Sequence, residues 1–172
     1  MRNLLLNLAV SLDGYIEDRN GGFDWCFTDQ DYGMGEFFQR IDAVFYGRKS
    51  FELVQSMGDE AGIPALQAYV FSNTLNEAPP NTILVRGDNL VDEVGRIKAL
   101  PGKDIWLFGG AGLIESLLPM GLVDELSLAV HPILLGGGTP LFPQFDNRIP
   151  LKLLSAQVYD SGLVMMRYEV TG

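Results

Sequence analysis

The strongest constraint on the fold of this chain is a repeated alternation of short apolar runs with segments of helical period. Near-continuous apolar runs are typical of strands that are buried on both faces of a sheet. The predicted strands span residues 4–10, 43–46, 67–71, 82–85 and 105–108. Apolar residues at helical spacing predict a short helix marked by Phe37, Phe38 and Ile41, and helices over residues 50–57, 90–100 and 113–118. This β-α-β-α order predicts a mostly parallel sheet with helices on both faces.

The last third of the chain has a different pattern. Residues 125–132, 151–159 and 163–170 are strand-like, and no helical segment separates them. Asp160-Ser161-Gly162 is a plausible hairpin turn between the last two. We therefore predict a single α/β domain over residues 1–172, a three-layer sandwich whose mostly parallel central sheet carries antiparallel C-terminal strands at one edge.

Charge and composition narrow the classes of function. The chain of 172 residues has a net charge of −10, which argues against nucleic-acid binding because phosphates require a basic face. A lone cysteine, Cys26, and a lone histidine, His131, make a zinc site implausible, and both are predicted to be packed residues. The apolar stretch at residues 4–10 is too short for a membrane span. We expect a cytoplasmic protein with no metal and no membrane partner.

A glycine-rich turn follows the predicted strand at 105–108. The run Gly109-Gly110-Ala111-Gly112-Leu113 leads from this strand into a helix. Such a turn presents free backbone N–H groups to an anion, and glycines allow a pyrophosphate to approach the backbone closely. A tight turn without a ligand would have the same composition.

Polar groups follow three other predicted strands. Gly47-Arg48-Lys49-Ser50 comes directly after residues 43–46, Ser72 and Asn73 after 67–71, and Arg86 after 82–85. The carboxyl ends of parallel strands meet at one edge of a sheet, where nucleotides bind. Cations after the second strand favour the 2′-phosphate of NADPH, whereas NADH binding calls for an acidic residue there. Alone, Gly47–Ser50 could also be a capped helix with two solvated charges.

Two loops supply candidate catalytic and substrate-binding residues. Asp13 stands in Ser11-Leu12-Asp13-Gly14-Tyr15-Ile16, which could equally be a hairpin turn. The loop at 23–31 places Asp29 and Asp31 near Trp25 and Phe27, so that a carboxylate could hold a heterocycle against an aromatic wall. The alternative for this loop is a solvated acidic segment with buried aromatic rings.

These motifs, in this order, resemble the dihydrofolate-reductase-like superfamily. The likeness is carried by residues 11–16, 47–50 and 109–112 and by the tail, Val123-Asp124-Glu125-Leu126 and residues 131–142. It is closest to the reductase domain of bacterial bifunctional riboflavin-biosynthesis enzymes. The resemblance implies hydride transfer from NADPH to a pterin- or pyrimidine-like heterocycle, such as dihydrofolate or a ribosylaminopyrimidine phosphate. It also implies a homodimer.

The resemblance assigns roles to individual residues. Gly109, Gly110, Ala111, Gly112 and Leu113 would hold the pyrophosphate, with a cis bond between Gly109 and Gly110. Gly47, Arg48, Lys49 and Ser50 would meet phosphates, Ser72 and Asn73 the adenosine end, and Asp13 would lie near the nicotinamide. The catalytic carboxylate could be Asp13, Asp29 or Asp31, because Gln30 stands where classical dihydrofolate reductases have their acid.

Two other functions remain open from the sequence. The chain could be a non-catalytic or regulatory nucleotide-binding homodimer with the same fold. It could also be an oxidoreductase that uses a flavin in the same cleft, although a flavin would not require the cations Arg48 and Lys49.

Overall fold

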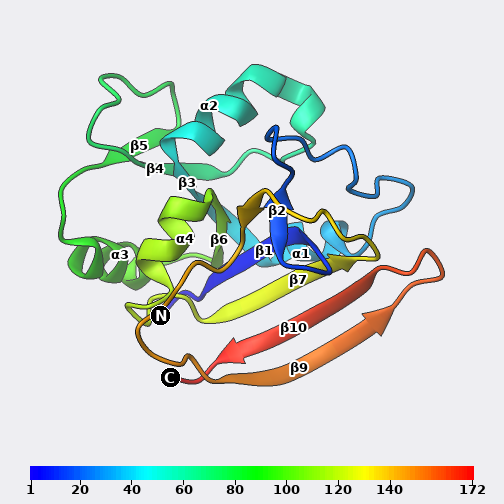
Figure 1. The fold of residues 1–172 in the computed structure, drawn as a ribbon. Helices are drawn as coiled ribbons and strands as arrows, with labels where there is room; N and C mark the ends of the chain where they lie inside the picture. Colours follow the sequence, from blue (N-terminus) through cyan, green and yellow to red (C-terminus); the bar gives the residue numbers. More distant parts are fainter.

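A computed structural model describes all residues from Met1 to Gly172. Its main feature is an eight-stranded sheet with the order β5-β4-β3-β6-β1-β7-β10-β9 (Figure 1). The strands are β1 (Leu4–Ser11), β3 (Ile41–Gly47), β4 (Gln67–Phe71), β5 (Thr82–Val85), β6 (Asp104–Gly109), β7 (Glu125–His131), β9 (Leu151–Val158) and β10 (Val164–Val170). The helices are α1 (Met34–Arg40), α2 (Arg48–Met57), a 3-10 turn (Gly58–Ala61), α3 (Leu90–Ala99) and α4 (Ala111–Leu117).

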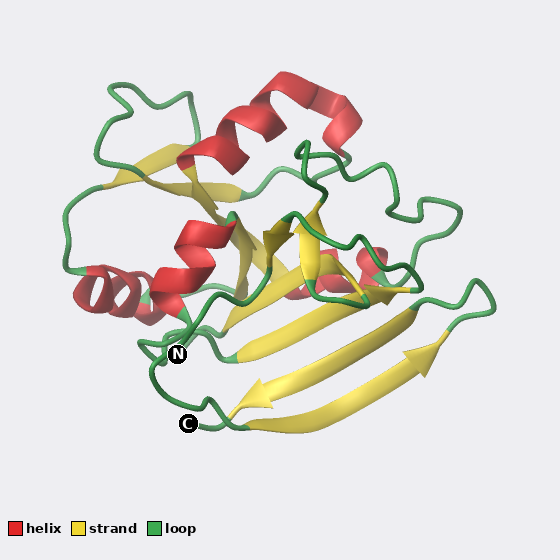
Figure 2. Cartoon of the chain, in the orientation of Figure 1, coloured by secondary structure: helices red, strands yellow, loops and turns green.

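Helices cover both faces of the sheet, as Figure 2 shows. Side chains alternate along each strand, so one strand contributes to two apolar layers. On β1, Leu4 and Leu6 pack in the layer that includes residues of α3 and α4, whereas Leu5 packs in the layer that includes residues of α1 and α2. The predicted class is confirmed: the fold is a three-layer α/β sandwich of the dihydrofolate-reductase type.

The sheet is parallel from β5 to β7 and antiparallel beyond it. β1 lies between β6 and β7 and is parallel to both, while β10 pairs antiparallel with β7 and β9. All eight residues of the edge strand β9 are exposed. The homodimer expected from the resemblance stays a prediction, and β9 is a strand edge open to such pairing.

Two short strands and one boundary differ from the sequence prediction. β2 (Tyr15–Glu17) and β8 (Thr139–Pro140) form a separate two-stranded sheet that was not predicted. Ile41 was predicted on a helix face, and this is wrong, because it is the first residue of β3. Its spacing from Phe37 suits a helix, but α1 ends at Arg40 and passes into β3 without a loop. None of the helices combines the length and the apolar composition needed to cross a bilayer.

Candidate functional site

The glycine turn after β6 and the end of β3 lie against each other. The Gly109–Gly110 peptide is cis, and a Cβ on Gly47 would lie 3.4 Å from the Gly110 nitrogen. A Cβ on Gly110 would lie 3.1 Å from Ser50 Oγ at the start of α2. The absence of side chains at these two positions therefore brings the two strand-to-helix turns together.

Two adjoining hollows open over these turns. One, of about 580 Å³, is lined by Arg48, Lys49 and Ser50 and by the turn from Gly110 to Leu113. The other, of about 370 Å³, is lined by Ser72 and Asn73 after β4, and both share Gly47, Gly112 and Leu113. We call the two together the nucleotide groove. It contains every residue predicted to bind a cofactor except Gly109 and Arg86.

Hydroxyl groups and cations stand at the α2 end of this groove. Arg48 donates a hydrogen bond of 3.3 Å to Thr74 Oγ1 and lies 3.9 Å from Glu52, with about half of its side chain exposed. Arg86 donates instead to the carbonyl oxygens of Asn73 and Leu75. Arg86 thus positions the loop after β4, while Arg48 remains accessible to a ligand.

The small sheet of β2 and β8 closes one side of the groove. Ile16 and Glu17 of β2 and Thr139 of β8 line the larger hollow. The two strands are joined by a 2.6 Å hydrogen bond from Thr139 Oγ1 to the Glu17 carboxylate. Arg19 donates a 2.7 Å hydrogen bond to the Gly136 carbonyl. This pair of strands forms a flap over the ends of β3 and β6.

Asp13 fastens the loop that leads to this flap. Its carboxylate accepts hydrogen bonds from Ser11 Oγ at 2.6 Å, Gly136 N at 2.8 Å and Leu135 N at 3.1 Å. These bonds, that from Ser11 above all, lower the pKa of Asp13 below the ordinary aspartate value. An ionised carboxylate held in this way cannot donate a proton at neutral pH. The geometry supports a positioning role, and the catalytic role stays a prediction.

We expect the carboxyl 13C resonance of Asp13 to titrate below the ordinary aspartate range in an NMR experiment. Because folding lowers the pKa of Asp13, its ionised carboxylate stabilises the folded state at pH values above the unfolded-state pKa. This contribution is lost as the pH falls through the folded-state pKa. Ser11→Ala should move the titration midpoint back upward, since it removes the largest cause. An unchanged midpoint in Ser11→Ala would contradict this explanation.

The loop at 23–31 packs on itself and on β7. Trp25 and Phe27 contact the ring of His131 edge-on, with ring centroids 5.3 and 5.1 Å away, and Phe27 N donates to His131 Nε2. His131 is 2% exposed, so its prediction as a packed residue is confirmed. Neither Trp25 nor Phe27 lines the nucleotide groove. Burial, and then the charge of Asp24, raise the pKa of Cys26 to about 11, which keeps that thiol protonated.

The two carboxylates of this loop are engaged locally. Asp29 accepts a 2.7 Å hydrogen bond from the Tyr32 hydroxyl, which lowers the pKa of Asp29. Asp31 accepts from the backbone N–H groups of Gly33 and Gly35 at the start of α1. Their predicted catalytic role stays a prediction, and in the structure each one orders the loop.

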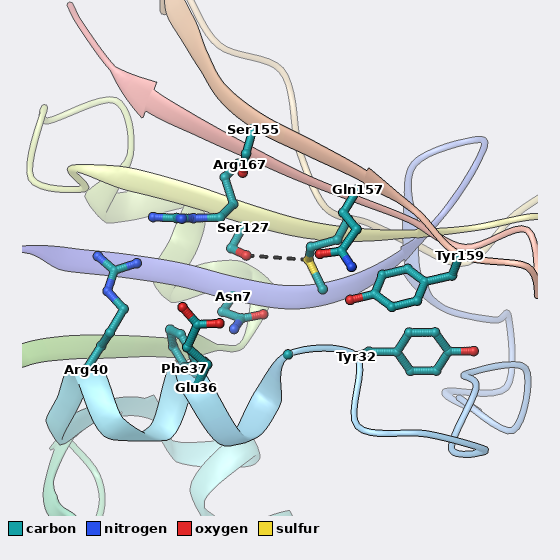
Figure 3. Close-up of a pocket in the computed structure, with 12 residues that line it drawn as sticks. Asn7, Tyr32, Glu36, Phe37, Arg40, Ser127, Ser155, Gln157, Tyr159 and Arg167 are labelled. Atoms are coloured by element: carbon teal, nitrogen blue, oxygen red, sulfur yellow. Dashed lines mark hydrogen bonds between the residues drawn. The ribbon is translucent and has the colours of Figure 1, made fainter.

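A second pocket, of about 150 Å³, lies between α1 and the face of β1, β7, β10 and β9 (Figure 3). We call it the α1 pocket. Phe37 and the rings of Tyr32 and Tyr159, which meet edge-on with centroids 4.8 Å apart, supply its aromatic lining. Glu36 projects from the first turn of α1 toward the sheet (Figure 3). Its carboxylate takes part in no hydrogen bond or ion pair within the chain.

Two buried polar side chains face this pocket from neighbouring strands. Asn7 on β1 and Ser127 on β7 are paired in register, and each is 7% exposed. The Asn7 amide donates only to the sulfur of Met34 at 3.9 Å, and Ser127 Oγ only to the sulfur of Met165 at 3.5 Å. Sulfur is a weak acceptor, so both groups keep most of their hydrogen-bonding capacity for another partner.

The sequence interpretation missed the α1 pocket, although the chain carries signals for it. Glu36 and Arg40 are four residues apart, which places them on one side of α1. Asn7 and Ser127 each lie between apolar residues of a buried strand. A polar residue inside a buried strand requires a partner, and two such residues in adjacent strands indicate a polar site.

Three comparisons relate this geometry to known proteins. The protein YyaP of Bacillus subtilis (strain 168) is 42% identical over 182 residues, covering 99% of this chain and 96% of its own length. The crystal structure of a Shewanella sp. PV-4 protein assigned to riboflavin biosynthesis is 30% identical, with a TM-score of 0.85 and all of both chains covered. A dihydrofolate reductase from Enterococcus faecalis complexed with NADP(H) has a TM-score of 0.68 at 16% identity, covering 99% of this chain and 97% of that chain.

The dihydrofolate reductase, at 16% identity, shows only that the fold is shared. The other two proteins are similar enough in sequence to indicate a common family. The match to the family covers residues 2–165 and therefore includes the nucleotide groove, the flap and all of the α1 pocket except Arg167. The chain belongs to the RibD C-terminal domain family.

Proposed function

We propose that this protein is an NADPH-dependent reductase that transfers a hydride to a pyrimidine- or pterin-like heterocycle. The observation that carries the proposal is the nucleotide groove, where two hollows of about 580 and 370 Å³ join across the carboxyl ends of β3, β4 and β6. Ligand sites in proteins have volumes of roughly 300–1,000 Å³. Membership of the RibD C-terminal domain family and the NADP(H)-bound reductase of the same fold support the same reading.

The residues of the groove fit this cofactor. A Cβ on Gly112 would meet no atom within 4 Å, so the glycine turn leaves open space where a pyrophosphate would lie. Arg48 and Lys49 stand at the end of β3, where NADH-specific sites carry an acidic residue. A guanidinium can bind a phosphate through two parallel hydrogen bonds, which favours the phosphorylated cofactor.

The bound cofactor would supply the hydride, and the chain would supply binding, orientation and a dry site. Arg48, Lys49 and Ser50 would hold phosphate oxygens. The flap of β2 and β8 would limit the access of water to the groove. Asp13 would keep the flap loop in place through its bonds to Leu135 and Gly136.

The α1 pocket is the proposed substrate site. It is one strand away from the groove, because Asn7 lies on β1, the strand next to β6. The Trp106 indole N–H on β6 donates a 3.0 Å hydrogen bond to the backbone carbonyl of Asn7. Its aromatic walls suit a flat ring, and its unpaired polar groups suit a ring with hydrogen-bonding edges. In this proposal Glu36 is the carboxylate that contacts the substrate.

A thermal-shift titration with NADPH, NADP, NADH, NAD and FMN tests the proposal. A ligand at a hundredfold excess over its Kd stabilises the folded state by about 2.7 kcal/mol, which raises the Tm of a domain of this size by roughly 5–10 °C. We expect that shift with NADPH and little with NADH. A shift with FMN alone would favour a flavoprotein, and no shift with any dinucleotide would overturn the reductase proposal.

Replacing Arg48 by alanine should weaken NADPH binding by about 10–100-fold, because a hydrogen bond to a charged group contributes roughly 1.5–3 kcal/mol. NADH affinity should stay unchanged, since it has no 2′-phosphate. Arg96→Ala is the matched control, because Arg96 is an exposed arginine on α3 that pairs with Glu93. Equal losses for both cofactors in Arg48→Ala would remove Arg48 from the 2′-phosphate site.

A further inference from the structure

Two arginines line the α1 pocket, and both are already neutralised by carboxylates of the chain. Arg40 lies 3.1 Å from Glu125 and 3.2 Å from Asp104. Arg167, on β10, lies 2.8 Å from the same Glu125 carboxylate through both Nε and Nη2. Figure 3 shows the two guanidinium groups at the same end of the pocket. Each arginine therefore already has a carboxylate partner within the chain.

Glu125 is the centre of this arrangement. Its side chain is 11% exposed, so its two ion pairs are shielded from solvent better than surface pairs are. Burial by itself lowers the pKa of Arg40, but the hydrogen bond and charge of Glu125, and then of Asp104, raise it above the ordinary value. Arg40 is therefore held in its charged form by partners inside the chain.

The rest of the pocket offers neutral hydrogen-bonding groups and one negative charge. Asn7 and Ser127 have only sulfur partners, and the Gln157 amide and the Glu36 carboxylate have none. Two guanidinium groups face three carboxylates, those of Glu125, Asp104 and Glu36, so the pocket and its ion pairs carry one net negative charge. A carboxylate binds N–H donors of a ligand and repels a phosphate.

We infer that the α1 pocket takes an uncharged nitrogen heterocycle that presents N–H donors to Glu36, and that Glu125 excludes phosphorylated substrates by occupying Arg40 and Arg167. The inference rests on the proposed function for its identification of the pocket as the substrate site. The inferred substrate therefore differs from the ribosylaminopyrimidine phosphate that the resemblance implies.

Ligand-observed NMR and calorimetry with two matched pairs of probes test this selectivity. Uracil and orotate differ by one carboxylate, and uridine and uridine 5′-monophosphate differ by one phosphate. We expect the neutral member of each pair to bind at least about tenfold more tightly, a difference of about 1.4 kcal/mol. Equal or tighter binding of the anionic members would overturn the inference, and so would no binding of uracil or uridine at about millimolar concentration, where binding free energies are near −4 kcal/mol.

Variants connect the selectivity to named residues. Glu36→Gln should weaken uracil binding at least about tenfold, because it removes a charge-assisted acceptor. Glu60→Gln, an exposed carboxylate in the 3-10 turn outside the pocket, is the matched control and should bind as the wild type does. Glu125→Gln should shift the preference toward orotate and uridine 5′-monophosphate, because it frees Arg167 and leaves Arg40 paired with Asp104 alone. Wild-type uracil affinity in Glu36→Gln would contradict the inference even if Glu125→Gln failed to fold.

The titrations are run without a dinucleotide, so they do not depend on the cofactor proposal. A thermal shift with NADPH together with preferred binding of phosphorylated probes would leave the reductase proposal standing and overturn the selectivity. Preferred binding of neutral probes without any dinucleotide shift would support the pocket chemistry and overturn the reductase proposal.

Discussion

Replacing Glu125 by alanine is expected to lower the free energy of unfolding by about 1–3 kcal/mol, less than for a fully buried ion pair, because the side chains of Arg40 and Arg167 are 32% and 38% exposed. The change leaves Arg167 without a carboxylate and Arg40 with Asp104 alone. The positive charges of both guanidinium groups would then have to be hydrated by solvent or remain only partly neutralised by the protein. For a domain of this size the Tm should fall by roughly 2–12 °C, measured by calorimetry at neutral pH.

The matched control is Glu169→Ala on the same sheet. Glu169 lies 3.6 Å from Lys152, and both side chains are at least half exposed. Exposed pairs contribute about 0–1 kcal/mol, so this variant should unfold almost as the wild type does. If the two variants lost the same small amount of stability, Glu125 would not be the centre of a shielded ion-pair network.

The second large effect is expected at Gly112, where leucine should abolish NADPH binding without unfolding the protein. Gly112 lines both hollows of the nucleotide groove, and a Cβ there would meet no atom within 4 Å. Glycine within a helix costs up to about 1 kcal/mol relative to better helix formers, so the variant should be at least as stable as the wild type. The added side chain would occupy the space of the cofactor, and we expect at least a hundredfold loss of affinity, about 2.7 kcal/mol.

Gly95→Leu is the matched control for this variant. Gly95 lies within α3, a Cβ there would also meet no atom within 4 Å, and it lines neither hollow. It should gain the same helix stability and keep full NADPH affinity by thermal shift and calorimetry. Undiminished NADPH binding in Gly112→Leu would show that the cofactor does not lie across the glycine turn.

The nucleotide groove was largely predictable from the sequence, because its residues come from short contiguous motifs. Gly47–Ser50 and Gly110–Leu113 each form one strand-to-helix turn, and parallel topology brings such turns to one edge of the sheet. Arg86 could not be placed in this way. Its side chain turns toward the loop at Asn73 and Leu75, a choice that depends on the path of that loop.

The α1 pocket was not predicted, because its residues are distant in the chain and individually ordinary. Asn7, Glu36, Ser127 and Gln157 come from four elements, and only the strand order β1-β7-β10-β9 places them together. In the structure the rings of Trp25 and Phe27 pack on His131, and their predicted role in binding a substrate stays a prediction.

The sequence by itself determined the order and type of the main elements, the parallel sheet with its antiparallel edge, and the glycine turn after β6. These properties follow from side-chain period and turn chemistry, which act over a few residues. Only the tertiary structure decided that β2 pairs with β8, that Asp13 holds the flap loop, and that Glu125 binds both arginines. Each of these contacts joins residues more than 40 positions apart, and long-range register and packing, not local preference, select such partners.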